Sequence, residues 1–387
     1  MTVNKANKKI KKTKNNNYLI SVIEAFVLTA AAVFLSVISG VFFADLIGFG
    51  CIVAASALIS CALFLTGASV ILISGIASFA ISFVLIDGDI ISALASLIYI
   101  VIAAFIYFGV KTKKNRTQIT LGATVFLTVF YIALIILSFL LETGTFSIGM
   151  VSSMIDSELT KSAELFVNQY NSLVTQSQSA GATSEAGQAI QTIVSAEDYI
   201  KELVMNLKAI IPACFIICNI IIAYLSTSLF KAAYNIFIPM ANPSRKRIKN
   251  KYWRINISAV SAVIMIVAIF LSVIVSKEDN ILTAIVLTNL VYILAPGFCL
   301  MGIYFVFDKL FNSRPGILPV ALVIGSVMLA FIFPFALTFI LYSMASVLMA
   351  LGLYSALIDD IKKFFDKAKK ALLGNNDDDD DNDDYID

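Results

Sequence analysis

The sequence predicts an all-α fold, a polytopic transmembrane helical bundle, because its charged residues lie almost entirely between long apolar runs. Hydrophobic residues make up 59% of the 387 residues and charged residues 14%, whereas soluble proteins have about 45–50% and about 25%. A hydrocarbon core about 30 Å thick needs about 20 apolar residues in a helix. Ile20 to Ser39, Ile119 to Leu141 and Ile255 to Val275 reach that length. The lipid bilayer is therefore the first expected partner.

The basic segments between the apolar runs predict the orientation. Positively charged loops face the cytoplasm, so an even number of crossings separates each neighbouring pair of basic segments. These segments are Lys5 to Lys14, Lys111 to Arg116, Arg245 to Arg254, Lys309 with Arg314, and Lys362 to Lys370. We therefore expect a multi-pass membrane protein with both termini in the cytoplasm.

The first interval between basic segments has room for about four spans. They are Ile20 to Ser39, Leu46 to Phe64, Ala68 to Ile86 and Ile91 to Val110, with turns at Asp45, Gly67 and Asp87 to Asp89. The first apolar run is longer than the roughly 7–15 residues of a signal peptide and ends without a small-x-small cleavage site, so we expect it to be retained.

The later intervals hold the remaining spans. They are Ile119 to Leu141, Ala209 to Phe230, a hairpin of Ile255 to Val275 and Ile281 to Phe307, and a final pair within Ile317 to Ile358 that breaks near Pro334. The total is about ten spans. The fallback is about eight, if Leu46 to Ile86 forms a single tilted or re-entrant unit and one other pair merges.

These spans divide the chain into regions. They are a basic cytoplasmic tail (residues 1–17), an N-terminal membrane region of about five spans (18–141), an extracytoplasmic amphipathic helical hairpin (142–208), a C-terminal membrane region of about five spans (209–361), and a cytoplasmic tail ending in an acidic disordered run (362–387).

Apolar residues recur about every three to four positions in the extracytoplasmic region, which predicts two amphipathic helices on either side of a break at Gln178 to Gly181. Leu159, Phe166, Tyr170, Leu203 and Leu207 are expected on buried faces. The helices either continue the flanking spans and pack on each other, or bind a partner or form a lid.

Polar residues inside the apolar runs are candidates for a polar cavity: Glu24, Asn219, Asn289 and Tyr292. An acidic residue at the bilayer centre costs about 2.5–3.5 kcal/mol, although Glu24 lies near the start of its span and can snorkel. Asn289 and Tyr292 share a helical face. Hydrogen bonds between packed helices explain these residues equally well, so cavity and packing both stay open.

A second candidate is a helix-packing face of small residues, Ala32, Ser36 and Gly40. This spacing lets helix backbones approach closely. The face packs either within the chain or against another membrane subunit.

The composition argues against an enzyme, a metal site or a cofactor. The chain has no histidine, which is the commonest catalytic base and metal ligand. Each cysteine lies within an apolar run: Cys51, Cys61, Cys214, Cys218 and Cys299. No folded basic domain accompanies the N-terminal lysines, so nucleic acid is not an expected partner.

Elements of the second half carry a resemblance to a known family. They are Ile211-Pro212, Asn235 to Pro243, Tyr252-Trp253-Arg254, Asn289 to Phe307, and Leu351-Gly352-Leu353 followed by Asp359-Asp360 and Lys362-Lys363. These residues and the layout of the chain resemble the YybS-like membrane proteins of bacteria. The resemblance implies a distant fold likeness to the substrate-binding subunits of energy-coupling-factor vitamin transporters.

We therefore expect a transporter-like or substrate-binding membrane subunit for a small molecule. The alternative is a non-transporting scaffold that organises envelope or membrane partners through its hairpin and cytoplasmic tails.

Overall fold

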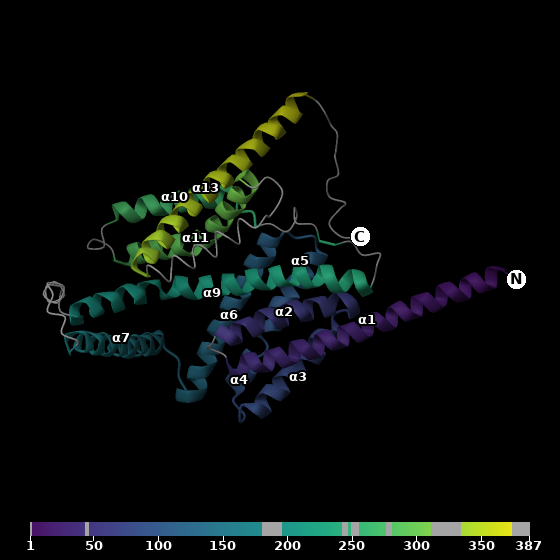
Figure 1. Ribbon diagram of the computed structural model, residues 1–387, viewed down its shortest axis with the longest axis horizontal. Helices are drawn as coiled ribbons and strands as arrows, with labels where there is room; N and C mark the ends of the chain where they lie inside the picture. Colours follow the sequence, from purple (N-terminus) through teal and green to yellow (C-terminus); the bar gives the residue numbers. More distant parts are fainter. Residues whose placement is uncertain are drawn as a thin grey trace. The chain divides into compact units, whose positions relative to one another are not determined.

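The computed structural model describes residues 2–42, 46–179, 196–241, 247–248, 255–275, 281–310 and 334–373 (Figure 1). All regular elements in these ranges are helices. They are α1 (Thr2–Val41), α2 (Leu46–Thr66), α3 (Ser69–Leu85), α4 (Ile90–Ala95), α5 (Ile98–Lys111), α6 (Arg116–Thr143), α7 (Ile148–Ser179), α9 (Ala196–Ala241), α10 (Ala259–Ile274), α11 (Ile281–Leu310) and α13 (Pro334–Leu373). The predicted all-α class is confirmed.

Seven helical stretches of the described residues are long and apolar enough to cross a membrane. The stretches are Ile20–Val41, Ile47–Thr66, Ile90–Lys111, Arg116–Thr143, Lys208–Met240, Ile281–Val306 and Ser343–Lys362. The shorter helices α3 and α10 are also apolar. The first half of the predicted final pair, residues 317–333, lies outside the described residues, so the total of about ten spans stays a prediction.

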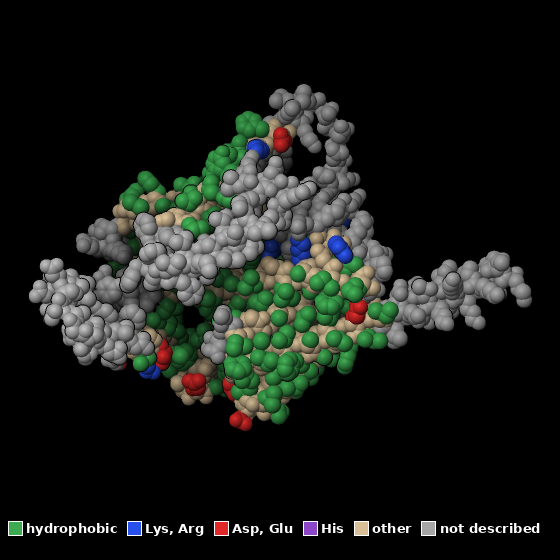
Figure 2. All heavy atoms as spheres, viewed as in Figure 1, with side chains coloured by type: hydrophobic (Ala, Val, Ile, Leu, Met, Phe, Trp, Pro, Cys, Tyr) green, Lys and Arg blue, Asp and Glu red, His purple; other side chains and the backbone are tan. Residues whose placement is uncertain are grey.

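Large apolar side chains cover the outside of these helices, as a lipid-facing surface requires. Phe26 is 74% exposed on α1, and Leu72 and Ile76 are 69% and 71% exposed on α3. Figure 2 shows apolar side chains spread over one face with few charged groups among them. Such a surface suits hydrocarbon rather than water.

The helices form two compact units, which are described separately. The first unit comprises Met1–Ile135, Ile216–Val267 and Ile293–Asp387, and the second comprises Ile136–Phe215 and Ala268–Tyr292.

Neighbouring spans of the first unit alternate in direction. The α1 hydroxyl of Ser36 donates to that of Ser78 on α3 over 2.7 Å, and Ser78 pairs with Tyr99 of α5 over 2.9 Å. Gly40, one turn after Ser36, lies beside Ile86 at the end of α3. Helices α1 and α3 therefore run parallel. Between them, α2 packs against α1 and ends at the turn of Gly67, where φ is +94°.

Later contacts extend this alternation. Helix α5 is antiparallel to α6, because Gly109 lies beside Ile119 and the earlier Phe105 lies beside the later Gly122. Helix α6 is antiparallel to α9, since Arg116 contacts Thr227, whereas Thr128, later in α6, contacts Asn219, earlier in α9. The start of α1, the α5–α6 turn and the end of α9 thus lie at one end of the first unit.

The predicted fourth span is divided into α4 and α5 around Ser96 and Leu97. The Ser96 hydroxyl donates to the Ala93 carbonyl over 2.7 Å. Such local hydrogen bonds compete with regular helix geometry and bend helices. This break was not predicted.

The predicted turn at Asp87 to Asp89 is present and caps α4. Asp87 and Gly88 have φ of +50° and +82°. The Asp89 carboxylate accepts hydrogen bonds from the Ser92 hydroxyl over 2.5 Å and from the Ile91 and Ser92 amides over 3.0 and 3.2 Å. These bonds, that of the Ser92 hydroxyl foremost, hold the pKa of Asp89 below its ordinary value.

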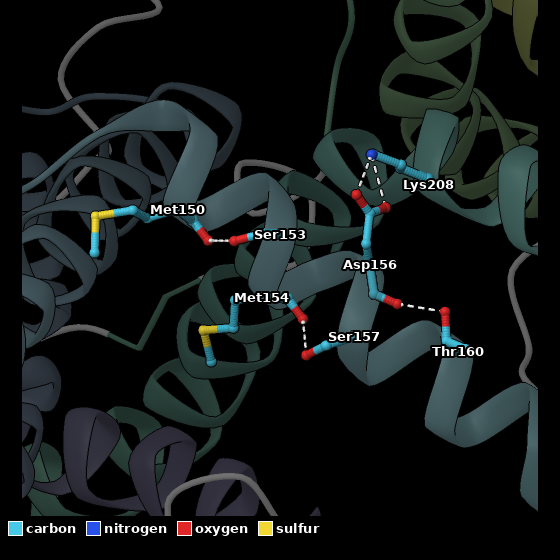
Figure 3. A network of polar contacts seen from close by, with 7 residues as sticks. All are labelled: Met150, Ser153, Met154, Asp156, Ser157, Thr160 and Lys208. Atoms are coloured by element: carbon cyan, nitrogen blue, oxygen red, sulfur yellow. Dashed lines mark hydrogen bonds and ion pairs between the residues drawn. The ribbon is translucent and has the colours of Figure 1, made fainter.

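In the second unit, an ion pair links α7 to the N-terminal part of α9. Lys208 Nζ lies 2.7 Å from Asp156 Oδ1 (Figure 3). Helix α7 is described as far as Ser179, and most of the predicted break at Gln178 to Gly181 lies outside the described residues. The side chains of Phe166, Tyr170, Leu203 and Leu207 lie outside the described residues, so the hairpin's packing along its length stays a prediction.

Candidate functional site

Of the predicted cavity residues, Glu24 and Asn219 belong to the first unit. Glu24 lies on α1, and its Oε2 is buried with no hydrogen-bond partner among the described residues. Asn219 on α9 is 2% exposed, and its Nδ2 donates to Thr128 Oγ1 of α6 over 3.2 Å. Asn219 therefore joins two helices, as the packing interpretation requires.

Asn289 and Tyr292 belong to the second unit. Asn289 Nδ2 donates to the Ala209 carbonyl over 2.7 Å, and its Oδ1 accepts from the Ala213 amide over 2.9 Å. A regular helix pairs these two backbone groups with each other. Pro212 lies between them, and it has no N–H to bond to the Lys208 carbonyl in the same turn. Asn289 thus binds the backbone of α9 beside its proline, whereas Tyr292 is 48% exposed.

The small-residue face is covered within the first unit. Ala32 and Ser36 have no exposed surface. A Cβ on Gly40 would lie 3.4 Å from the Ser92 carbonyl oxygen and 3.5 Å from Ile86. The face therefore contacts the α3–α4 region, and a partner subunit would have to use a different surface.

A polar cluster in the first unit surrounds Arg116 at the start of α6. Arg116 is only 4% exposed. Its Nε donates to Thr227 Oγ1 over 3.1 Å, and its Nη2 donates to the Tyr224 carbonyl over 3.0 Å and to the Ser228 hydroxyl. The guanidinium also lies 4.1 Å from the centre of the Tyr224 ring. One face of α9 thus holds a buried cation of α6.

The Arg116 cluster extends to α11 and one further turn of α9. The hydroxyls of Tyr224 and Tyr304 lie 3.0 Å apart, and Tyr304 lies near the Arg116 guanidinium. Lys231 lies close enough for its charge to interact with that of Arg116. Fixed cations in apolar surroundings attract anions more strongly than cations in water. The cluster, defined as Arg116, Tyr224, Thr227, Ser228, Lys231 and Tyr304, therefore suits a negatively charged group.

The sequence pattern does not reveal this cluster, because Arg116 follows three lysines and its charge is typical of a basic loop. A usable signal was present in α9. Tyr224, Thr227, Ser228 and Lys231 recur at helical spacing and place polar groups on one face of an apolar run. Searches against protein-family models, curated proteins and solved structures return no match for this chain.

Proposed function

We propose that this multi-pass protein is a transporter-like, substrate-binding membrane subunit for a small molecule. The Arg116 cluster is the observation that carries the proposal. Arg116 lies at the start of its span, and ionisable groups that are buried between membrane helices are costly and are characteristic of substrate and ion pathways. Arg116 is buried beside a second cation, Lys231, and beside the paired hydroxyls of Tyr224 and Tyr304.

The chemistry of the cluster favours a substrate with an anionic group. Guanidinium groups suit carboxylates and phosphates because their donors lie in a rigid plane. Tyrosine hydroxyls add donors that fix orientation. We place the substrate's negative charge beside Arg116 and Lys231.

The proposed location is the bacterial cytoplasmic membrane, with the basic end of the first unit inside the cell. Support comes from the helix directions, because the α5–α6 turn carries Lys111, Lys113 and Lys114 and lies at the same end as the start of α1. Membership of the YybS-like family is part of the same proposal.

The substrate proposal is tested by the structure of the purified protein in lipid nanodiscs. We expect ordered non-lipid density beside Arg116 and Tyr304, and mass spectrometry of the released solutes should identify an anionic small molecule. Lys231→Gln removes one cation and should lower the amount of that solute. The matched control Lys161→Gln changes an exposed lysine of α7 that pairs with Glu158, and should leave the amount unchanged.

The second candidate function is a membrane scaffold. It is favoured by Asn219 and Asn289, which bond to neighbouring helices rather than to each other. Two results together would contradict the substrate proposal and support the scaffold. The first is the absence of ordered density beside Arg116, and the second is a membrane partner that co-purifies in mild detergent in an amount equal to that of this protein.

A further inference from the structure

A groove of about 420 Å³ lies beside the turn that joins α5 to α6. The lining side chains are Phe105, Phe108, Thr112, Lys114, Gln118 and Ile119, with Gly109 completing the surface. Phe105 lies about two helical turns before Thr112, so the groove extends roughly 10 Å along α5. Its polar residues lie near the turn, and its aromatic residues lie deeper along the span.

Close packing of the two helices fixes the base of the groove. A Cβ on Gly109 would lie 2.5 Å from Ile119 Cγ1, and one on Gly122 would lie 3.1 Å from the Phe105 ring. The Phe105 ring also packs on that of Phe126, with centroids 4.6 Å apart. The apolar wall is therefore preformed rather than assembled by a ligand.

The turn beside the groove is strongly positive. It carries Lys111, Lys113 and Lys114, and the sequence has no acidic residue between Asp89 and Glu142. Lys111 lies over the ring of Tyr107, 5.6 Å from its centroid. Lys114 lines the groove and Lys113 does not.

The donors available at the groove come from two side chains. The Thr112 hydroxyl donates to the Phe108 and Gly109 carbonyls over 2.8 and 3.2 Å, so it offers only acceptor capacity to a ligand. The Lys114 ammonium and the Gln118 amide supply donors. Their position at the end of two apolar helices matches the level of lipid headgroups.

We propose that this groove binds one anionic phospholipid. Its phosphate contacts Lys114 and Gln118, and the upper part of an acyl chain lies along Phe105, Phe108 and Ile119. The Lys114 ammonium, which lines the groove, selects a negatively charged headgroup over a zwitterionic one. The apolar walls explain why the ligand is a lipid, since a free phosphate makes no use of them.

The test measures lipid binding to the full chain by native mass spectrometry, with phosphatidylglycerol and phosphatidylcholine as probes. We expect phosphatidylglycerol to bind more tightly. Lys114→Gln should weaken its binding about fivefold, the factor that corresponds to one cation at a membrane surface. Gln118→Glu, which keeps the side-chain size but adds a negative charge, should also weaken it. Lys113→Gln is the matched control in the same turn and should have a much smaller effect.

Distinct outcomes would overturn the proposal. Equal losses for Lys113→Gln and Lys114→Gln would indicate general attraction of a charged surface to lipid. Equal binding of the two lipids would exclude selection by headgroup charge. Displacement of the lipid by inorganic phosphate alone would indicate a soluble anion site. Thermal unfolding in phosphatidylcholine nanodiscs checks that each variant is folded.

Discussion

Gly352→Ala is expected to destabilise the protein by about 3 kcal/mol, at the upper end of the cost of overpacking a well-packed core. Gly352 of α13 lies against α11, where a Cβ would overlap the Phe298 carbonyl and lie 3.0 Å from the Gly302 amide nitrogen. Both clashes are with backbone, which cannot rotate away as a side chain can. Helix α11 or α13 must therefore shift.

Gly50→Ala is the matched control for this substitution. Gly50 lies inside α2, and a Cβ there would have no atom within 4 Å. Alanine favours helix by about 0.5–1 kcal/mol over glycine. Thermal unfolding in detergent should therefore show a lower Tm for Gly352→Ala and an unchanged or higher Tm for Gly50→Ala. An equal Tm for both variants would show that α11 and α13 do not approach as closely as described.

Arg116→Met is expected to cost about 2 kcal/mol of stability. The substitution removes hydrogen bonds to Thr227, Ser228 and the Tyr224 carbonyl, and bonds to a charged group contribute about 1.5–3 kcal/mol each. The contact with the Tyr224 ring adds up to about 2 kcal/mol. Burying a cation costs several kcal/mol, and the substitution removes that cost. The net loss of stability is therefore smaller than the lost contacts alone would give.

Arg116→Lys separates charge from geometry at the same position. Lysine keeps the positive charge but lacks the planar fork that bonds several acceptors at once. Its unfolding temperature should lie between those of wild type and Arg116→Met, while the exposed Lys113→Met should match wild type. If Arg116→Met is as stable as wild type, the Arg116 cation does not hold α6 to α9. Ligand binding would then remain as the role of Arg116.

The sequence allowed the helical membrane class to be predicted, because the length of an apolar helix follows directly from bilayer thickness. Turns at Gly67 and at Asp87 to Asp89 were predictable for the same local reason, since glycine and aspartate adopt the required backbone geometry. The break around Ser96 was not, because it depends on one side-chain hydrogen bond within an apolar run.

The candidate site was less predictable, because the spacing of residues along one helix does not show which residues of other helices pack against them. Asn289 is a candidate both for a cavity and for helix packing, and its amide contacts the α9 backbone beside Pro212. Arg116 and Tyr224 are more than a hundred residues apart in sequence, and only the packing of α6 on α9 brings them together.

Cysteine accessibility tests the orientation most directly, in a variant that lacks the native cysteines. Lys113 occupies the turn at the basic end of the first unit, and Ser179 ends α7. With a membrane-impermeant maleimide, we predict that Ser179→Cys is labelled in intact cells, whereas Lys113→Cys is labelled only after permeabilisation. Labelling of Ser179→Cys only after permeabilisation would contradict the orientation and, with it, a cytoplasmic position for the basic turns.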